Sequence, residues 1–444
     1  MLADPHPVIP FRGVADASIR LSGSKSIINR ALLLAALASG ETTLEGALFS
    51  EDTVIMSEAL RRLGFAVHED ADREEIRVQG RGGTMPAGSA GLFVGLAGTA
   101  ARFLTALCCA LTSGRYRIDG VPQMRRRPMK GLLDALSALG ARISSSNGFL
   151  PLEIEAGGLD GGNVELDATS SSQLLSALLM IAPLARGPVQ IRLTDPGYRR
   201  EYVTMTLRMM EQFGQPAAIA SDDGMCVRPP HGLPYRSPGL RYTIEPDASA
   251  ASYFLALPIV TGGRVQLPGL PADSLQGDAA FAERVRAMGA KVERSPSGLT
   301  CQFDRSTQAT AIQDDFHAIS DTFLTLAAIA PLLAGATRIT GIAHTRKQET
   351  DRVSGMACEL RRIGQHVLET HDSLEIHPRP LVSGVEIETY HDHRFAMSFG
   401  ILGCHDLHGD GRPWLSIKNP GCCAKTFPRF FEVLERVRVE SSSN

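Results

Sequence analysis

Basic side chains stand at the start of several segments whose composition predicts an α-helix. Lys25 and Arg30 lie in "SGSKSIINR", Arg102 lies in "GLAGTAARF", and Arg394 lies in "TYHDHRFAM". Cations at the amino end of a helix oppose the helix dipole, so their repetition there requires a counter-charge. The unsatisfied backbone N–H groups at such ends also attract anions. The pattern predicts a binding site for a ligand that carries more than one negative charge.

The stretch "LSGSKSIINRALLLAALASG", residues 21–40, looks like the end of a nucleotide-binding loop. A phosphate-binding loop of that kind needs GxxxxGK[ST], in which the lysine directly follows the second glycine. Lys25 instead follows Gly23 by two residues, and no glycine lies five residues before Gly23. The chain also has no GxGxxG motif. The stretch is therefore expected to bind a single anion, and ATP binding is not supported.

Two histidine-rich stretches offer a metal site as an alternative. They are "HDH" at 391–393 and "HDLH" at 405–408. His391 and His393 lie two residues apart at the start of a predicted helix, where side chains at that spacing point apart. A metal centre is therefore disfavoured. The small polar residues before the helices also have a simpler interpretation, as ordinary N-caps that satisfy backbone N–H groups.

The composition is that of a globular protein with reduced cysteines. The net charge is −3, from 45 basic and 48 acidic residues, which gives no reason to expect nucleic acid or an anionic membrane as a partner. The longest aliphatic runs reach about half of a membrane span, and the first residues lack the pattern of a signal peptide. The eight cysteines include the pairs Cys108–Cys109 and Cys422–Cys423 but no CxxC, which indicates free thiols in a cytoplasm.

A repeat of about 75 residues positions the charged loops. Helical segments that end in glycine and lead into a short strand-like run recur in two registers. The glycines of the first register are spaced by 76, 74, 75 and 75 residues and are Gly64, Gly140, Gly214, Gly289 and Gly364. Those of the second register are spaced by 74, 73, 75, 73 and 74 residues and are Gly40, Gly114, Gly187, Gly262, Gly335 and Gly409.

Each half of the repeat predicts a helix followed by a strand. Leucine and alanine at i, i+3 and i+4 give the helix an apolar face, and the terminal glycine suits a left-handed cap. The predicted fold class is α/β, with six repeated units that share cores in two domains of three units each. The Pro- and Gly-rich stretch at 231–242 is the best linker, so we predict domains at 1–23 plus 242–444 and at 24–241.

Eight stretches resemble, in order and along nearly the whole chain, the signatures of the 5-enolpyruvylshikimate-3-phosphate synthase family of enolpyruvyl transferases. They are "LSGSKSIINRALLLAALASG", "GLAGTAARF", "MRRRPM", "TSSSQLLSALLM", "PDASAASYFLA", "KQETDR", "HDHRFAM" and "CCAKTFPRFF". The resemblance implies a two-domain inside-out α/β barrel, in which each domain has three βαβαββ units around a pseudo-threefold axis.

The resemblance also implies an activity. Members of the family transfer the enolpyruvyl (1-carboxyvinyl) group of phosphoenolpyruvate to the 5-hydroxyl of 3-phosphoshikimate and release phosphate, in the shikimate pathway to chorismate. No metal or organic cofactor is implied. The expected form is a cytoplasmic monomer whose partners are these two small molecules, with neither nucleic acid nor a membrane.

The resemblance assigns a role to each matching residue. The residues implied to bind phosphoenolpyruvate are Lys25, Gly98, Arg127, Arg352, Arg394 and Lys425. The residues implied in catalysis are Asp321, Glu349 and Lys25, with the two carboxylates in proton transfer to the methylene carbon and from the hydroxyl. The residues implied to hold the acceptor are Ser26 and Arg30 at its carboxylate, and Ser171, Ser172, Gln173, Tyr202 and Asp321 around its ring and 3-phosphate.

These residue types suit the implied chemistry. Phosphoenolpyruvate carries a phosphate and a carboxylate, so it requires several fixed cations, among them arginines that bind with two N–H groups. Charge develops at C2, where preorganised charge stabilises it, and one acid and one base must move protons. The cations come from both halves of the chain, so we expect the domains to close on the substrate. Gly98 also implies sensitivity to glyphosate, which mimics the phosphoenolpyruvate state in this family.

Four residues depart from the commonest pattern of the family, and most of them belong to the acceptor side. Leu96 and His344 stand where asparagine is common, Arg199 stands where a serine that binds phosphate is expected, and Gln348 stands where a lysine contacts the acceptor. We expect Arg199 and His344 to supply the positive charge that Gln348 lacks, which keeps 3-phosphoshikimate as the acceptor. The alternative is an enolpyruvyl transferase that acts on a different alcohol in secondary metabolism.

Two further functions fit the sequence less well. The enolpyruvyl transferase of murein synthesis uses a loop cysteine, and the comparable stretch "VPQMRRRPM" has none. A non-catalytic anion-binding protein would not need Asp321 and Glu349. An RNA-end-processing protein would be expected to have a basic surface and a nucleotide site, which the net charge and the missing loop motif speak against.

Overall fold

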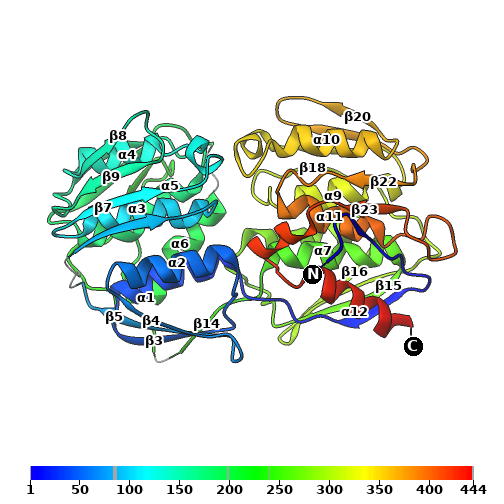
Figure 1. Cartoon of the computed structure of the whole chain (residues 1–444), viewed down its shortest axis with the longest axis horizontal. Helices are drawn as coiled ribbons and strands as arrows, with labels where there is room; N and C mark the ends of the chain where they lie inside the picture. Colours follow the sequence, from blue (N-terminus) through cyan, green and yellow to red (C-terminus); the bar gives the residue numbers. More distant parts are fainter. Residues whose placement is uncertain (1, 84–87, 198–199, 240, 443–444) are drawn as a thin grey trace. The chain divides into compact units, whose positions relative to one another are not determined.

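The computed structural model describes residues 2–83, 88–197, 200–239 and 241–442, and Figure 1 shows them as a ribbon. The chain forms two compact units. Unit 1 consists of residues 1–22 and 245–444, and unit 2 consists of residues 23–244. The domain boundaries that we predicted from the sequence lie after residues 23 and 241. Unit 2 is one continuous stretch of chain, whereas unit 1 is made from both ends.

Unit 2 contains, in its described residues, three four-stranded sheets and six α-helices. The helices are α1 (Lys25–Leu37), α2 (Glu51–Arg62), α3 (Gly98–Ala110), α4 (Lys130–Ala138), α5 (Ser172–Ile181) and α6 (Arg200–Gln212). The sheets, in spatial order, are β14 (Arg241–Thr243), β3 (Ser39–Glu45), β5 (Glu75–Arg81) and β4 (Ala66–Asp70); β6 (Ser89–Phe93), β7 (Arg115–Asp119), β9 (Leu152–Glu155) and β8 (Arg142–Ser145); and β10 (Gly162–Leu166), β11 (Val189–Leu193), β13 (Cys226–Arg228) and β12 (Ile219–Ala220).

Unit 1 has the same kinds of element in its described residues. The helices are α7 (Ala248–Thr261), α8 (Phe281–Ala287), α9 (Phe323–Ile329), α10 (Arg352–Arg362), α11 (His393–Gly403) and α12 (Phe430–Ser442). The sheets, in spatial order, are β16 (Lys291–Ser295), β17 (Gly298–Phe303), β15 (Gly263–Pro268) and β2 (Ala15–Ser18); β18 (Gln313–Asp315), β19 (Thr337–Thr340), β21 (Leu374–His377) and β20 (His366–Glu369); and β1 (His6–Pro7), β23 (Leu415–Ile417) and β22 (Val385–Ile387).

One pairing pattern recurs in these sheets. In the second sheet of unit 2, β6 and β7 form a parallel pair, and β9 and β8 continue it as antiparallel strands. The other four-stranded sheets likewise begin with a parallel pair, and these pairs are β14 with β3, β10 with β11, β2 with β15, and β18 with β19. The three-stranded sheet contains the parallel pair β22 and β23, and β1 pairs with β23 in the antiparallel direction. The predicted α/β fold class with repeated units is therefore confirmed.

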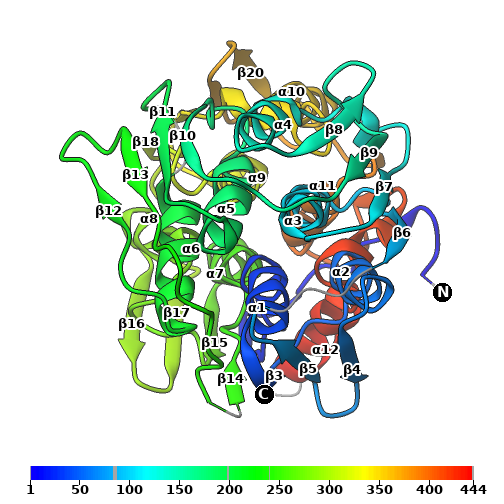
Figure 2. The ribbon, with the colours of Figure 1, turned by 90° about the vertical axis from the view of Figure 1, so that its left-hand side faces the viewer.

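The helices that follow the charged loops form the interior of each unit. The sequence of α3, "GTAARFLTALCCA", is mostly apolar around its whole circumference, and every residue of the helix is buried. In unit 2, α1 and α5 are buried along most of their length, and α7 and α11 are buried in unit 1. Figure 2 shows α1, α3 and α5 inside the sheets of unit 2. No helix in the described ranges has the length and apolar composition needed to cross a membrane.

Glycines end the outer helices as the sequence predicts. All five glycines of the first register have φ between 84° and 106°, the left-handed conformation of a helix cap. In the second register the predicted cap is found at Gly262, which ends α7 with a φ of 77°. The prediction is wrong at Gly40 and Gly114, because the residues that cap α1 and α3 are Ala38 and Leu111, both in an extended conformation.

The prediction is also wrong at Gly187, which does not have a positive φ. The helical segment before it continues into a 3₁₀ turn (Ala182–Leu184) and ends at Ala185 in an extended conformation, so the glycine is not needed as a cap.

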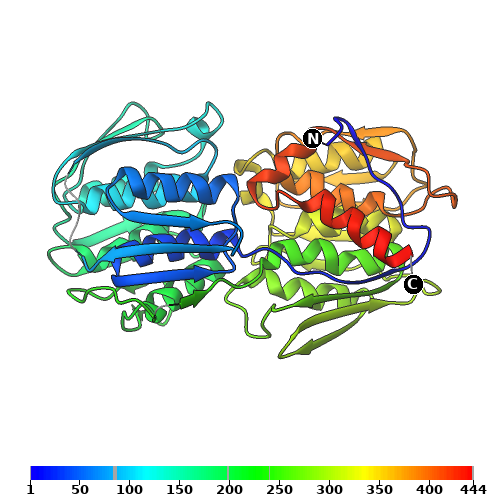
Figure 3. The same ribbon diagram turned by 60° about the horizontal axis from the view of Figure 1, so that its bottom comes forward.

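The amino-terminal segment belongs to unit 1. In β1, His6 pairs with Ile417 of β23, and in β2, Ala15 pairs with Gly263 of β15. This segment runs beside α12, as Figure 3 shows. Two of the sheets of unit 1 are therefore completed by strands from the opposite end of the chain.

Candidate active site

Lys25 is the first residue of α1, and a close backbone approach fixes the chain just before it. A Cβ at Gly23 would lie 2.1 Å from the carbonyl oxygen of Gly46, so only glycine fits there. Ser24 is the N-cap, and in the described structure its side chain makes no capping hydrogen bond. The Lys25 ammonium lies 3.6 Å from Oδ2 of the buried Asp52 on α2. Lys25 is thus held at a helix start by a carboxylate.

Arg30, on the same helix, is a buried cation that neutral groups surround. Its Nε donates to Oγ1 of Thr206 at 2.8 Å. Its Nη1 donates to the carbonyl oxygen of Ser26 at 2.8 Å, and its Nη2 donates to Oγ of Ser176 at 3.1 Å. The ring of Tyr202 lies 5.9 Å from the guanidinium carbon. Burial lowers the pKa of Arg30 to about 10. A buried guanidinium with such partners is suited to bind a carboxylate or a phosphate.

Two guanidinium groups approach the first residue of α3. Arg102 donates from Nη1 to the carbonyl oxygen of Gly98 at 3.0 Å, and from Nη2 to that of Pro128 at 2.7 Å. A Cβ at Gly98 would lie 2.6 Å from Nη1 of Arg127 and 2.7 Å from Nη1 of Arg102. Only glycine therefore lets both buried cations lie against this helix start. Two cations at the positive end of a helix dipole form a site suited to an anion.

Ser171, Ser172 and Gln173 form the start of α5. The Oγ of Ser171 accepts a hydrogen bond from the backbone N–H of Gln173 at 3.3 Å, so the N-cap interpretation is correct at this loop. Ser172 is buried. The side-chain amide of Gln173 donates to Oγ1 of Thr99 at 3.2 Å, which links α5 to α3. The predicted acceptor residues of this loop therefore lie beside the predicted phosphoenolpyruvate residues at the start of α3.

Arg352, the first residue of α10, is the centre of a charged cluster in unit 1. Its Nε lies 2.7 Å from Oδ2 of Asp392, its Nη1 lies 3.0 Å from Oδ1 of Asp321, and its Nη2 lies 2.9 Å from Oε2 of Glu349. Burial by itself lowers the pKa of Arg352, but the charges of the three carboxylates outweigh burial and raise it. The guanidinium therefore stays charged and holds both carboxylates that the resemblance implies in catalysis.

Arg394 and Lys425 extend this cluster. Nη2 of Arg394 lies 2.9 Å from Oδ2 of Asp321, and its Nη1 donates to Oη of Tyr253 at 3.3 Å. Burial raises the pKa of Tyr253, so its hydroxyl stays protonated. Nζ of Lys425 lies 3.9 Å from Oε1 of Glu349. Asp321 and Glu349 each therefore contact two cations, and both share the Arg352 guanidinium.

Asp392 is a member of the cluster that the sequence analysis did not predict. Its carboxylate is fully buried, pairs with Arg352, and accepts a hydrogen bond from the backbone N–H of Arg394 at 3.0 Å, which caps α11. From the sequence, Arg394 was given a role in this stretch, and its histidines were weighed as a metal site, but Asp392 itself was assigned no role. His391 is exposed and His393 is buried, and the described residues include no group of three metal-ligating side chains. The sequence signal that could have identified Asp392 is a carboxylate at a predicted N-cap close to a basic residue.

His344 contacts the residue next to a predicted catalytic carboxylate. Its Nε2 lies 2.8 Å from Oγ of Ser320, which directly precedes Asp321. Its ring lies 5.1 Å from that of His317, in an edge-to-face arrangement. His344 therefore contacts the chain at the residue before Asp321.

Gln348 joins the same cluster through Arg352. Its side-chain carbonyl oxygen accepts a hydrogen bond from Nη1 of Arg352, while the neighbouring Lys347 is exposed. Leu96 is half-buried in the loop that precedes α3. Arg199 lies outside the described residues. Of the departures from the family pattern, Gln348 thus contacts the arginine that pairs with both predicted catalytic carboxylates, and His344 contacts the residue before one of them.

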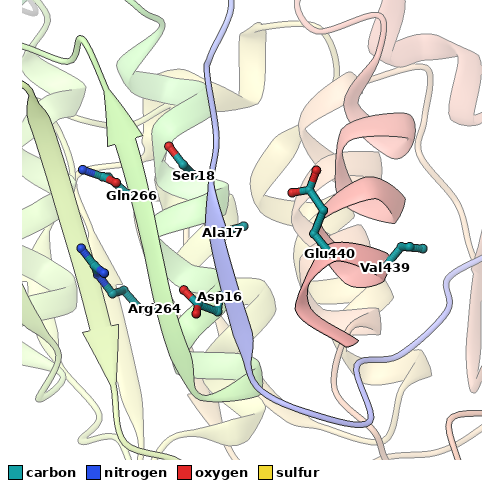
Figure 4. Close-up of a pocket in the computed structure, with 7 residues that line it drawn as sticks. All are labelled: Asp16, Ala17, Ser18, Arg264, Gln266, Val439 and Glu440. Atoms are coloured by element: carbon teal, nitrogen blue, oxygen red, sulfur yellow. The ribbon is translucent and has the colours of Figure 1, made fainter. Parts of the chain in front are cut away.

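A pocket of about 600 Å³ lies elsewhere in unit 1, between β2, β15 and α12 (Figure 4). The residues that line it are Asp16, Ala17, Ser18, Arg264, Gln266, Val439 and Glu440. None of the predicted site residues lines this pocket. The candidate active site of unit 1 is therefore the buried ion cluster around Arg352.

The chain is similar to known proteins over nearly its whole length. The family model for EPSP synthase (3-phosphoshikimate 1-carboxyvinyltransferase) matches residues 13–434. A 3-phosphoshikimate 1-carboxyvinyltransferase from Opitutus terrae is 56% identical over 99% of each chain. One from Nostoc punctiforme is 43% identical over 95% of this chain and 97% of its own. A solved EPSP synthase from Acinetobacter baumannii has a TM-score of 0.80, 26% identity and 97% coverage of both chains.

The fold and the ion clusters at its helix starts define an enolpyruvyl transferase. The chain belongs to the EPSP synthase (3-phosphoshikimate 1-carboxyvinyltransferase) family, as the sequence resemblance predicted. The alternative of an enolpyruvyl transferase for a different alcohol is not favoured by these relatives.

The first prediction concerns Asp392. Asp392→Asn removes the charge that pairs with Arg352 but keeps an amide that can cap α11. We expect the free energy of unfolding to fall by about 3 kcal/mol, because a buried guanidinium loses part of its compensating charge. Urea unfolding followed by circular dichroism measures this loss.

The control for that variant is Asp410→Asn. Asp410 pairs with Arg412 at 3.2 Å on the surface, where both side chains are more than half exposed. Such exposed pairs contribute at most about 1 kcal/mol. Equal losses in the two variants would contradict the structural role given to Asp392.

Proposed function

We propose that the protein transfers the enolpyruvyl group of phosphoenolpyruvate to the 5-hydroxyl of 3-phosphoshikimate and releases phosphate. The observation that carries this proposal is the buried cluster in which Asp321 and Glu349 each contact two cations and share Arg352. The relatives that are 56% and 43% identical are 3-phosphoshikimate 1-carboxyvinyltransferases, which supports the same reaction in this chain.

The reaction requires two proton transfers in its addition step, one more in its elimination step, and an exchange of one C–O bond for another. In the addition step, the methylene carbon gains a proton, and the acceptor hydroxyl loses its proton as its oxygen bonds to C2. In the elimination step, the new methyl group loses a proton and the bond from C2 to the phosphate oxygen breaks. A fixed acid and a fixed base lower the barrier to such steps, and preorganised charge stabilises the charge that develops at C2.

We assign the two proton transfers of the addition step to Asp321 and Glu349. Asp321 accepts from both Arg352 and Arg394, an arrangement that favours the ionised carboxylate required of a general base. Glu349 lies between Arg352 and the ammonium of Lys425, which can donate a proton. The hydroxyl proton is therefore assigned to Asp321, and protonation of the methylene carbon is assigned to the pair of Glu349 and Lys425.

The two anionic groups of phosphoenolpyruvate require cations from the remaining predicted residues. We assign its binding to Lys25, Gly98, Arg127, Arg352, Arg394 and Lys425. Glycine at position 98 matters because it lets the guanidinium of Arg127 lie against the start of α3. An arginine fork can donate two hydrogen bonds to one phosphate or carboxylate, which fixes orientation as well as charge.

The acceptor requires a second set of polar groups. We assign its carboxylate to Ser26 and Arg30, and its ring and 3-phosphate to Ser171, Ser172, Gln173, Arg199, Tyr202, Asp321, His344 and Gln348. The buried Arg30 supports the first assignment, because its contacts described above are to neutral oxygens and a carboxylate would balance its charge. We further propose that the two compact units are the two domains of the family, and that the protein acts as a monomer in the cytoplasm.

The second prediction tests the acceptor. Purified protein with phosphoenolpyruvate is expected to release phosphate when 3-phosphoshikimate is added, and shikimate, which lacks the 3-phosphate, is the matched control. We expect shikimate to be a much poorer acceptor, because each lost ionic contact to a phosphate costs roughly 2 kcal/mol or more. Phosphate release no faster with 3-phosphoshikimate than with buffer would rule out the proposed reaction.

The third prediction concerns the two carboxylates. Asp321→Asn and Glu349→Gln are each expected to lower kcat by about 100-fold to 10,000-fold, because each removes a group that moves a proton. The control variant is Glu432→Gln. Glu432 is exposed on α12 and pairs with Arg429, which precedes that helix. Full activity in both active-site variants would show that these carboxylates have no catalytic role.

The fourth prediction concerns Gly98. Gly98→Ala would place a methyl group 2.6 Å from Nη1 of Arg127 and 2.7 Å from Nη1 of Arg102, so the guanidinium groups must move. We expect KM for phosphoenolpyruvate to rise by about tenfold or more, while KM for 3-phosphoshikimate changes less. Steady-state kinetics with each substrate varied in turn measures both constants. Gly91→Ala is the control, because a Cβ at Gly91 meets no atom within 4 Å.

A further inference from the structure

The adjacent residues Cys422 and Cys423 lie three and two positions before Lys425 and have no part in the proposed reaction. They belong to a 3₁₀ helix (Pro420–Lys425) in unit 1. Cys423 is 2% exposed and packs in the hydrophobic core, whereas Cys422 is half-buried at its edge. The neighbouring Gly421 is exposed, and a Cβ there would meet no atom within 4 Å. Cys422 is therefore the more accessible residue of the pair.

The thiol of Cys423 interacts with that of the neighbouring Cys422. Burial raises the pKa of the Cys423 thiol, and the hydrogen bond with Cys422 and the charge of Asp392 raise it further. Cys423 is therefore a protonated thiol beside a more accessible one. The pair offers two sulfur atoms at one place, on a short helical turn that holds them together.

A direct disulfide between these residues is unfavourable. Disulfides usually join residues whose Cα atoms are about 4.4–6.8 Å apart, whereas consecutive Cα atoms are about 3.8 Å apart across a trans peptide. A single atom that bridges the two sulfurs enlarges the ring and removes much of this strain. The pair therefore favours a thiophilic bridging atom over oxidation to a disulfide.

A second pair of adjacent cysteines provides an internal comparison. Cys108 and Cys109 lie within α3 and are 0% and 1% exposed. Burial raises the pKa of both thiols. Reagents that need a thiol at the surface cannot reach this pair in the folded protein, whereas the pair Cys422–Cys423 includes one cysteine that is only half-buried.

We propose that Cys422 and Cys423 form a dithiol site that captures trivalent arsenicals, with both sulfurs bound to one arsenic atom. With phenylarsine oxide, two S–As bonds form and two S–H bonds break. The two thiol protons leave with the arsenic-bound oxygen as one molecule of water. Arsenic stays trivalent, so the step needs neither an oxidant nor a reductant.

Capture at this pair affects the neighbouring ion cluster. Lys425 follows Cys423 by two residues on the same short helix, and its Nζ lies 3.9 Å from Oε1 of Glu349. A bridging arsenic atom changes the positions of both cysteines and therefore moves the backbone that carries Lys425. This consequence for turnover rests on the proposed function, whereas the capture itself does not.

The test uses the full-length protein, reduced and freed of small thiols, with phenylarsine oxide as the probe. Intact-mass spectrometry is expected to show one phenylarsenic group per chain, which remains in the presence of 2-mercaptoethanol and is released by 2,3-dimercaptopropanol. A thiol titration is expected to show the loss of two thiols. If the proposed function holds, turnover falls by about 100-fold, as for other small displacements at an active site.

Two variants locate the site, and a third is the control. Cys422→Ser and Cys423→Ala are each expected to lose the tightly held group, and Cys422→Ser keeps the test valid if the buried Cys423→Ala variant is unstable. Cys358→Ser, at an exposed single cysteine, is expected to retain it. Uptake that persists in Cys422→Ser, or peptide mapping to Cys108 and Cys109, would overturn the proposal. Stoichiometric uptake without loss of turnover would overturn only the link to Lys425.

Discussion

The guanidinium of Arg352 lies almost completely out of contact with water, and in that position it has to be matched by negative charge. Three carboxylates provide this charge, and each belongs to a different helix start. Asp321 lies just before α9, Glu349 lies just before α10, and Asp392 is the N-cap of α11. One buried charge therefore ties the beginnings of three helices together. The same pairing orients the two carboxylates that we assign to proton transfer, so stability and chemistry depend on one interaction.

Unit 2 handles its buried cations in a different way. Lys25 has a carboxylate partner in Asp52, but the contacts of Arg30 and Arg102 described above are to hydroxyl and carbonyl oxygens. Neutral oxygens satisfy the N–H groups of a guanidinium without cancelling its charge. These contacts therefore leave the charge of Arg30 uncancelled on α1. The two units thus differ in the partners of a central buried arginine, because carboxylates pair with Arg352 in unit 1 and neutral oxygens accept from Arg30 in unit 2.

The interior of the fold could be predicted from the sequence because its signal is local. Helices such as α3 are apolar around their whole circumference, and the glycine period marks where each unit repeats. The polar partners could not be predicted in the same way. Arg352 and Asp392 are forty residues apart, and Arg30 and Thr206 lie still further apart along the chain. No periodic pattern in the sequence connects such partners. Pairings of this kind arise only when helices pack. The sequence therefore indicated the cations at the helix starts but not their partner Asp392.

The path of the chain also sets the order in which the protein can be completed during synthesis. The strands of unit 2 all lie between Ser39 and Thr243, so its three sheets can form before the second half of the chain exists. In unit 1, β2 cannot pair until β15 has been made, and β1 cannot pair until β23 has been made. Domains generally fold as units, from the amino terminus onward. Here the strands β1 and β2 are made long before the strands with which they pair.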